Sequence, residues 1–172
     1  MEREPSPTRI RPLTRDDEPF LWDALYFAIH VPAGVDAPEF GIVKRPELAR
    51  YVADWMRRPG DVGFAAEEAA GPIGAAWLRR GSSGERGFGF LDEEIPELSM
   101  SVLPGHRGRG VGTKLLRRLL AAAEERWDAV SLSVSESNPA RRLYERERFT
   151  PVRATGDGSI TMIRRFASRS TE

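Results

Sequence analysis

The chain has 172 residues with 26 basic and 26 acidic side chains, so its formal net charge is zero. A balanced charge gives no overall field that would attract nucleic acid or an anionic membrane, and we expect neither as a partner. The chain has no cysteine and only two histidines, which excludes disulfides and a cysteine nucleophile and predicts no metal site. Residues 1–11 contain no apolar core of signal-peptide length and no run approaches a membrane span, so we expect a cytoplasmic protein.

The N-terminal third predicts one strand and two helices. Alternating apolar residues predict a short strand over 10–13, after a polar segment, 1–8, that we expect to be a loose tail. Thr14, followed by three acidic residues, is typical of a helix N-terminus, and we expect the helix to reach Ile29. A loop rich in proline and glycine over 31–41 precedes a second predicted helix over 46–57.

The middle of the chain predicts a hairpin followed by an irregular segment. The segments 62–67 and 73–79 have strand composition and flank a turn at Ala70-Gly71-Pro72. Residues 80–94 are rich in glycine and charge, so we expect them to be the least regular part of the interior.

The most informative segment lies between a strand and a helix. Leu98, Met100 and Val102 alternate with serines and predict a strand over 98–103, and leucines at helical spacing predict a helix that ends near 126. Three glycines at 108, 110 and 112 separate the two elements and allow a tight turn with accessible N–H groups. Because the first turn of a helix adds unpaired N–H groups and a positive dipole end, this arrangement predicts an anion site of the kind that binds phosphates.

The C-terminal part completes a layered fold. A strand over 129–135 is followed by Asn138 as helix cap and Pro139 at the first helical position, and two further strands flank a turn at 156–158. We expect residues 167–172 to form a loose tail. Hairpins followed by one strand–helix–strand crossover predict a single α+β domain, 1–172, with a mixed sheet.

Three phosphate-binding patterns compete for the glycine-rich loop. A Walker loop would need Lys after Gly110, where Val111 stands, and the dinucleotide pattern would need glycine where Thr113 stands. The pattern R-x-x-G-x-G fits Arg107, Gly110 and Gly112, and it resembles the acyl-coenzyme A pyrophosphate loop of the GNAT acetyltransferase superfamily. The resemblance extends over residues 63–149 and includes Glu97, the segment Asn138-Pro139-Ala140 and the segment Leu143-Tyr144-Glu145 in the family's order.

The resemblance implies a three-layer domain with a mixed, mostly antiparallel sheet flanked by helices, and acetyl-coenzyme A as cosubstrate. It implies that the loop binds the diphosphate mostly through main-chain N–H groups; the residues are Arg107, Gly108, Arg109, Gly110, Val111, Gly112 and Thr113. It further implies that the pantetheine arm runs beside Met100, Val102 and Leu103, with the Val102 N–H polarising the thioester carbonyl. The side chains of these strand residues are equally compatible with an ordinary core.

Glu97 is the candidate general base. Strand alternation places it on the face of Ser99 and Ser101, and a carboxylate with a raised pKa in a partly buried cleft suits removal of a proton from an ammonium group. Two alternatives stay open. Glu97 ends an acidic run that begins at Asp92 and that would ordinarily face solvent, and Glu67 or Glu68 at another strand end is a possible replacement.

Tyr144 is the candidate general acid, because a phenol stays protonated at neutral pH and can donate to a departing thiolate. A tyrosine that only packs in the core is the alternative. Asn138 is expected to cap its helix and to contact the pantetheine or substrate end. One departure from the family pattern is Arg148, which stands where glycine usually precedes the aromatic residue, here Phe149, and which puts the turn after the helix in question.

These residues together predict an N-acetyltransferase that moves an acetyl group to a primary amine by direct attack. An acyl-coenzyme A-binding sensor without turnover is the alternative, and a nicotinamide dinucleotide site with Glu136 as ribose ligand is a third. The acceptor stays open among a small amine, an amino acid, an antibiotic amino group and a peptide N-terminus. The aromatic-rich N-terminal third fits an acceptor pocket, a plain core or a homodimer interface.

Overall fold

A mixed sheet of seven strands, in the order β1-β2-β3-β4-β5-β7-β6, organises the computed structural model, which describes residues 7–167. The strands are β1 (Arg9–Pro12), β2 (Val62–Glu68), β3 (Gly71–Arg79), β4 (Glu97–Val102), β5 (Ala129–Ser135), β6 (Thr150–Ala154) and β7 (Ser159–Arg165). The helices are α1 (Glu18–Ala28), α2 (Pro46–Ala49), α3 (Val111–Glu124) and α4 (Ala140–Arg146), with 3₁₀ turns η1 (Arg15–Asp17) and η2 (Phe40–Lys44). The predicted tails fall largely on residues 1–6 and 168–172, which lie outside the described residues.

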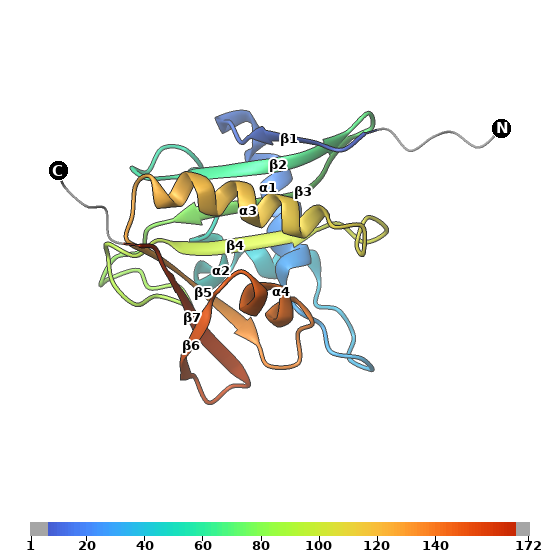
Figure 1. Cartoon of the computed structure of the whole chain (residues 1–172). Coiled ribbons are helices and arrows are strands. Elements are labelled where there is room, and N and C mark those ends of the chain that lie inside the picture. The colour runs from blue at the N-terminus through green and yellow to red at the C-terminus, as the bar shows by residue number, and fades with distance from the viewer. Residues whose placement is uncertain (1–6, 168–172) are drawn as a thin grey trace.

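Helices cover both faces of the sheet, which confirms the predicted three-layer α+β fold (Figure 1). On one face, the leucines of α3 and Tyr144 of α4 pack with Ala76 and Leu78 of β3 in one apolar cluster. On the other face, α1 and the turn after α2 pack on Ala75 and Trp77 in a second cluster. Alternation along β3 therefore supplies both cores from one strand.

The sheet consists of two antiparallel parts that meet at one point. In the first part, which runs from β1 to β4, each strand pairs antiparallel with the next strand of the chain. In the second part, β7 lies between β5 and β6 and pairs antiparallel with both. The parallel contact between β4 and β5 pairs only Glu97 with Ser131, so the strands separate beyond this pair. A dinucleotide-binding fold needs a sheet built mostly of parallel strands, so the dinucleotide hypothesis is wrong.

The second predicted helix is mostly absent. α2 ends at Ala49, and the expected remainder to Arg57 is a series of turns in which Asp54 and Met56 have positive φ angles of 58° and 65°. Two carboxylates outside the expected helix keep its last part from being helical, because the N–H of Trp55 donates to Glu18 at 2.8 Å and the N–H of Met56 donates to Asp61 at 2.9 Å. Helical periodicity could not reveal these partners.

The turn after α4 keeps its usual form despite the missing glycine. Arg148 has φ of 68°, its N–H donates to Glu145 O at 3.0 Å, and the N–H of Phe149 donates to Tyr144 O at 3.0 Å. This pair of bonds is a Schellman motif with Arg148 at the left-handed position. Phe149 is 2% exposed and meets the Tyr144 ring edge-on at a centroid distance of 5.8 Å, so the turn also fixes the candidate acid.

The strained Arg148 gives a stability prediction. Arg148→Gly relieves the left-handed strain of a side-chain-bearing residue but adds freedom to the unfolded chain, so we expect a net gain of about 0.5–1 kcal/mol in the free energy of unfolding. Urea denaturation measures this gain. The control is Arg146→Gly inside α4, which we expect to lose about 1 kcal/mol; an equal loss in both variants would contradict the strain argument.

Candidate functional site

The predicted anion loop presents a run of free main-chain donors. Among the described residues, no protein acceptor pairs with any N–H from Arg107 to Thr113; the next N–H, that of Lys114, donates to Gly110 O at 3.2 Å. Gly110 is the N-cap of α3 with φ of 77°, a conformation that favours glycine and that turns the loop into the helix. Unpaired amides at the positive end of a helix dipole form an anion site, so the structure fits a diphosphate here.

The charged side chains of the loop are engaged with the protein. The Arg107 Nε donates to Val102 O at 2.9 Å, and Arg109 pairs with Glu68 at 3.0 Å. The His106 Nδ1 lies 2.7 Å from the same Arg109 nitrogen, so this histidine has partners that the sequence did not reveal. These contacts brace the loop against β2 and β4 and leave anion binding mainly to the main chain.

β4 and β5 separate beyond the pair of Glu97 and Ser131 and leave an opening between them. The hydrogen bonds of β4 show which of its amides face this opening. The N–H of Ser131 donates to Pro96 O at 3.0 Å on the β5 side, and the N–H of Leu103 donates to Ile73 O at 2.8 Å on the β3 side. Because strand amides alternate in direction, the N–H groups of Met100 and Val102 point toward β5, where no strand of residues 7–167 pairs with them. Of the three predicted pantetheine contacts, Leu103 alone directs its N–H into the sheet.

The opening and the loop lie next to each other. A Cβ built on Gly112 would lie 3.7 Å from Met100 Cε, 3.8 Å from Val102 Cγ2 and 3.7 Å from Leu143 Cδ2. The first turn of α3, the end of β4 and α4 therefore converge around Gly112. The structure brings the free donors of the loop and the free amides of β4 to one place.

Glu97 lies at the closed end of the opening, where β4 and β5 pair. Its side chain shares a strand face with Ser101, as predicted, and this is the face covered by α1 and α2, because Ser101 donates to Ala24 O at 2.6 Å. Glu97 is only 7% exposed, and burial raises the pKa of its carboxyl group to about 7 despite hydrogen bonds from Tyr51 and the Gly89 N–H. This residue, unlike the rest of the acidic run, is inside the protein.

The irregular segment 80–94 covers this carboxylate. A Cβ on Gly87 would lie 2.2 Å from Glu97 Oε1, and a Cβ on Gly89 would lie 2.6 Å from the Leu132 carbonyl carbon, so both contacts need glycine. Ser131 Oγ also donates to Gly89 O at 2.7 Å. The segment is irregular, as predicted, and it is held at the junction of β4 and β5.

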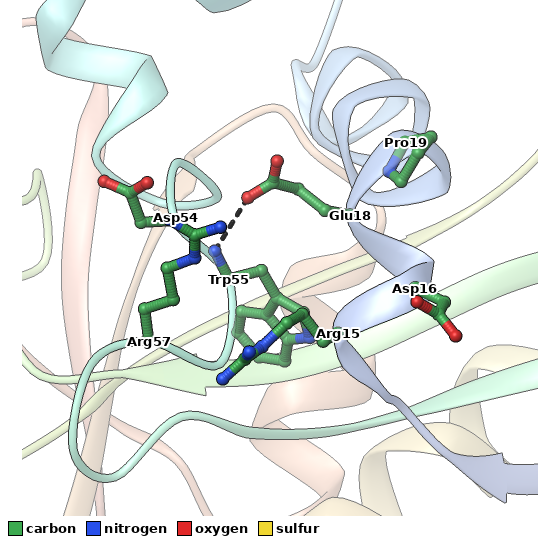
Figure 2. A pocket seen from close by; sticks show the side chains of 7 residues that line it. All are labelled: Arg15, Asp16, Glu18, Pro19, Asp54, Trp55 and Arg57. Atoms are coloured by element: carbon green, nitrogen blue, oxygen red, sulfur yellow. Dashed lines mark hydrogen bonds between the residues drawn. The ribbon is translucent and has the colours of Figure 1, made fainter.

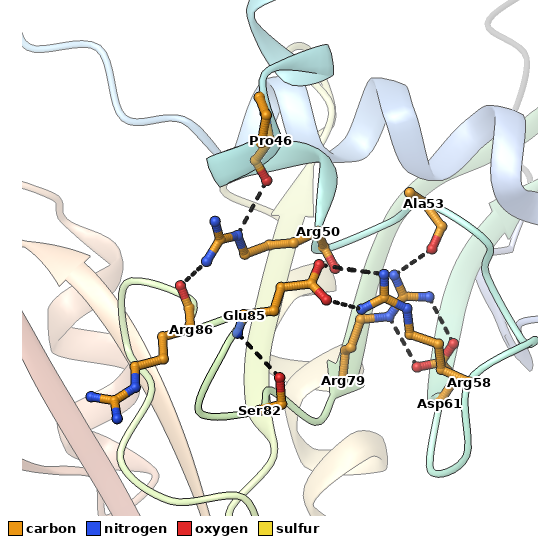
Figure 3. Close-up of polar contacts among 9 residues, drawn as sticks. All are labelled: Pro46, Arg50, Ala53, Arg58, Asp61, Arg79, Ser82, Glu85 and Arg86. Carbon is orange, nitrogen blue, oxygen red and sulfur yellow. Dashed lines mark hydrogen bonds and ion pairs between the residues drawn. The ribbon is translucent and has the colours of Figure 1, made fainter.

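A small cavity of about 20 Å³ adjoins Glu97, enough for one water molecule. Beside it, Figure 3 shows Arg79 paired with Asp61 at 2.8 Å and Arg58 paired with Glu85 at 3.1 Å. Arg79 also donates to the carbonyl groups of Arg50 and Ala53 at 3.1 and 2.6 Å, which holds the turn after α2 in place. This network keeps the cavity polar and fixes the element that carries Tyr51.

Tyr144 lies on the opposite face of the sheet from Glu97, in the cluster around α3. It is 7% exposed, no hydrogen bond to its hydroxyl occurs among the described residues, and burial raises its pKa to about 12. The phenol therefore keeps its proton at neutral pH. α4 begins one residue later than predicted, so Pro139 and not Asn138 is its N-cap, but Asn138 still accepts from the Ala140 N–H of the first turn at 2.9 Å.

The alternative bases lie at the other end of the sheet. Glu67 accepts from Arg9 at 2.9 Å, and two arginines lower its pKa. Glu68 pairs with Arg109 of the loop. Neither carboxylate is near the junction of β4 and β5 that Glu97 occupies.

A separate hollow of about 340 Å³ lies where α1 begins, between η1 and the turn at 54–57 (Figure 2). Its charges are mixed on both sides, with Asp54 and Arg57 on the turn and Arg15, Asp16 and Glu18 on η1 and the start of α1. None of the predicted site residues lines it.

Within residues 7–167 no group of three or more metal-ligating side chains occurs, and no helix of this part is long and apolar enough to cross a membrane.

Sequence reasoning missed the partners of Glu97. Tyr51 donates to Glu97 Oε2 at 2.5 Å across 46 positions of sequence, and the segment of Gly87 and Gly89 covers the carboxylate. Two closely spaced glycines in an otherwise charged segment are the one signal of a close approach. Nothing in the sequence indicates the tyrosine.

The buried carboxylate predicts a pH-dependent stability. Because the folded-state pKa of Glu97 is about 7 and its ordinary value is 4.5, the stability that this group contributes is present below pH 4.5 and is lost as the pH rises through 7. Glu97→Gln removes the titration. The measured quantity is the free energy of unfolding of the variant minus that of the native protein, from urea denaturation. We expect this difference to increase by about 2 kcal/mol from pH 5 to pH 8.

Glu94→Gln, which removes a surface carboxylate paired with Arg80, is the matched control for the loss of one charge. If the free energy of unfolding of Glu97→Gln differed from that of the native protein by the same amount at both pH values, the claim that burial raises the pKa of Glu97 would be contradicted.

Comparison with known proteins agrees with this geometry. The family model described as the acetyltransferase (GNAT) family matches residues 33–148. The chain is similar to an N-acetyltransferase from Staphylococcus aureus Mu50 at 18% identity and a TM-score of 0.67, covering 93% of this chain and 99% of that one. It is also similar to the GNAT domain of PAT from S. lividans, at 22% identity and a TM-score of 0.64, covering 92% of this chain and 90% of that chain.

A third similar structure is YncA of Salmonella typhimurium, a putative acetyltransferase solved with acetyl-CoA, at 22% identity and a TM-score of 0.64, covering 95% of this chain and 96% of that one. A comparison with curated protein sequences finds no match. The family model spans most of the chain, and it includes the loop, the opening between β4 and β5, Glu97 and Tyr144. The chain belongs to the GNAT acetyltransferase family.

Proposed function

We propose that this protein is an acetyl-coenzyme A-dependent N-acetyltransferase that acetylates a primary amine by direct attack. The observation that carries the proposal is the run of unpaired amides from Arg107 to Thr113 beside the opening between β4 and β5. This arrangement fits a ligand with a diphosphate at one end and a thin, extended arm at the other. Coenzyme A has both features.

The free amides of β4 support the placement of the arm. Met100 and Val102 direct their N–H groups into the opening, where an extended arm takes the place of a missing strand. The Val102 N–H then donates to the thioester oxygen and stabilises the negative charge that develops there. Lys114 is exposed in the first turn of α3 and adds positive charge at the diphosphate end.

The two proton-transfer groups lie on opposite faces of the sheet, with the opening between them. Glu97, on the α1 and α2 face, accepts a proton from the amine, either directly or by way of a water molecule in the small cavity beside it. Tyr144, on the α3 and α4 face, donates a proton to the departing thiolate. Direct attack through the opening needs no covalent intermediate on the protein.

Burial of Glu97 favours one alternative. The carboxylate is 7% exposed under Tyr51 and the segment of Gly87 and Gly89, which would suit a protein that binds the acyl donor without turnover. Such a sensor would bind coenzyme A and would release no thiol with any amine.

The acceptor is proposed only as a class. Small amines, amino acids, antibiotic amino groups and peptide N-termini are the candidates, and the α1 and α2 face supplies their approach to Glu97. One protein of the same fold at 18% identity, from Escherichia coli, is named ribosomal-protein-S18-alanine N-acetyltransferase, so the acceptor panel includes a peptide with N-terminal alanine.

The test is a thiol-release assay with acetyl-coenzyme A across this panel. We expect release with at least one amine and no burst of thiol before the amine is added. Glu97→Gln should lower kcat about 100-fold or more and leave the KM for acetyl-coenzyme A unchanged, because the loop lies at the other end of β4.

Glu94→Gln serves as the charge-matched control, with its carboxylate at the surface. Binding of coenzyme A without turnover on any amine would favour the sensor. A stoichiometric burst without amine would contradict direct attack.

A further inference from the structure

The hydroxyl group of Tyr51 is hydrogen-bonded on two sides, to Glu97 and to a backbone amide. Its hydroxyl donates to Glu97 Oε2 at 2.5 Å and accepts from the Phe88 N–H at 2.7 Å. The Phe88 ring stacks on the Tyr51 ring at a centroid distance of 6.4 Å, with an angle of 13° between the planes. Because the amide can only donate, the single hydroxyl proton is directed at the carboxylate.

The backbone of Tyr51 is fixed as well. The indole N–H of Trp77 donates to Tyr51 O at 3.0 Å, and both side chains are buried in the cluster under α1. Arg79 holds the neighbouring carbonyl groups of Arg50 and Ala53. Tyr51 thus lies on a turn whose carbonyl groups are held by Trp77 and Arg79.

The second carboxylate oxygen of Glu97, Oε1, faces the segment 80–94. Gly87 lies against Oε1, and the Gly89 N–H lowers the pKa of the carboxyl group. The charged groups that line the adjoining cavity are Arg50, Arg58, Arg79, Arg80 and Glu85. Arg58, Arg79 and Arg80 are each paired with a carboxylate other than Glu97, and Arg50 donates to the Arg86 carbonyl.

We propose that Tyr51 is a positioning residue for the acetyl transfer: its hydroxyl, held by the Phe88 amide, fixes the orientation of the Glu97 carboxylate at the junction of β4 and β5. This inference rests on the proposed role of Glu97 as base. It assigns to Tyr51 no contact with either substrate. It also explains why the segment 80–94 lies against the junction without regular structure, because two glycines let its backbone reach Glu97 and Tyr51.

Tyr51→Phe tests the proposal. Loss of a donor to the carboxylate raises the pKa of Glu97, and a base is active when deprotonated, so the midpoint of the kcat/KM profile should move up by about one pH unit. The same shift should appear in ¹³C NMR titration of the Glu97 carboxyl carbon, which needs no amine; Glu97→Gln assigns the resonance.

Tyr26→Phe is the matched control, because it deletes a phenol hydroxyl that donates to Pro38 O at 2.6 Å and does not touch Glu97. We expect the Glu97 titration in this variant to match that of the native protein. An unchanged titration in Tyr51→Phe would overturn the inference.

Gly87→Ala tests the same geometry while keeping the hydroxyl, in case Tyr51→Phe does not fold. Its Cβ would lie 2.2 Å from Glu97 Oε1 and 2.5 Å from Tyr51 Oη, so the pair must separate. We expect kcat to fall at least 10-fold at an unchanged KM for acetyl-coenzyme A, and the Glu97 titration to move. Gly84→Ala in the same segment meets no atom within 4 Å and is the control.

The outcomes separate the two claims. Loss of activity in Glu97→Gln with native titration and kinetics in both Tyr51→Phe and Gly87→Ala would overturn the positioning role and leave the function in place. Full activity in Glu97→Gln would refute Glu97 as base and the positioning role with it. A shifted titration together with a lowered kcat in the Tyr51 or Gly87 variant supports the inference.

Discussion

The single pairing of Glu97 with Ser131 is the constraint on which the site depends. If β4 and β5 were hydrogen-bonded along their length, the amides of Met100 and Val102 would be used by the sheet and no opening would exist. Because the strands meet at one pair and then separate, main-chain donors of β4 stay free next to the free donors at the start of α3. The two antiparallel parts of the sheet are joined by the apolar cluster around α3, in which side chains from both parts pack against the helix.

The same junction organises the chemistry of the buried carboxylate. Glu97 stands where the sheet is closed, so water reaches it poorly and its pKa rises to about 7. Tyr51 and the Gly89 N–H supply the hydrogen bonds that make burial of a carboxylate tolerable. A carboxyl group that titrates near neutrality at the end of an opening is suited to accept a proton there and release it again.

Local patterns predicted most of this fold, since alternation marks the strands, leucine spacing marks α3 and the glycines around Gly110 mark the loop. The failures involve partners that local periodicity does not show. Carboxylates of Glu18 and Asp61 take the amides of Trp55 and Met56, so the predicted helix over 46–57 does not run to its end, and Tyr51 meets Glu97 from the irregular turn that replaces it. The turn at Arg148 shows the converse, because two hydrogen bonds and the burial of Phe149 impose a left-handed conformation that the residue itself disfavours.

The central claim is that the amides from Arg107 to Thr113 hold the diphosphate of an acyl carrier, and amide NMR tests it most directly. Titration of ¹⁵N-labelled protein with coenzyme A should shift the resonances of these residues downfield, as hydrogen bonds to an anion do. Pantetheine, which lacks the diphosphate, should leave them in place. Resonances of this run that do not respond to coenzyme A, or that respond equally to pantetheine, would contradict the account.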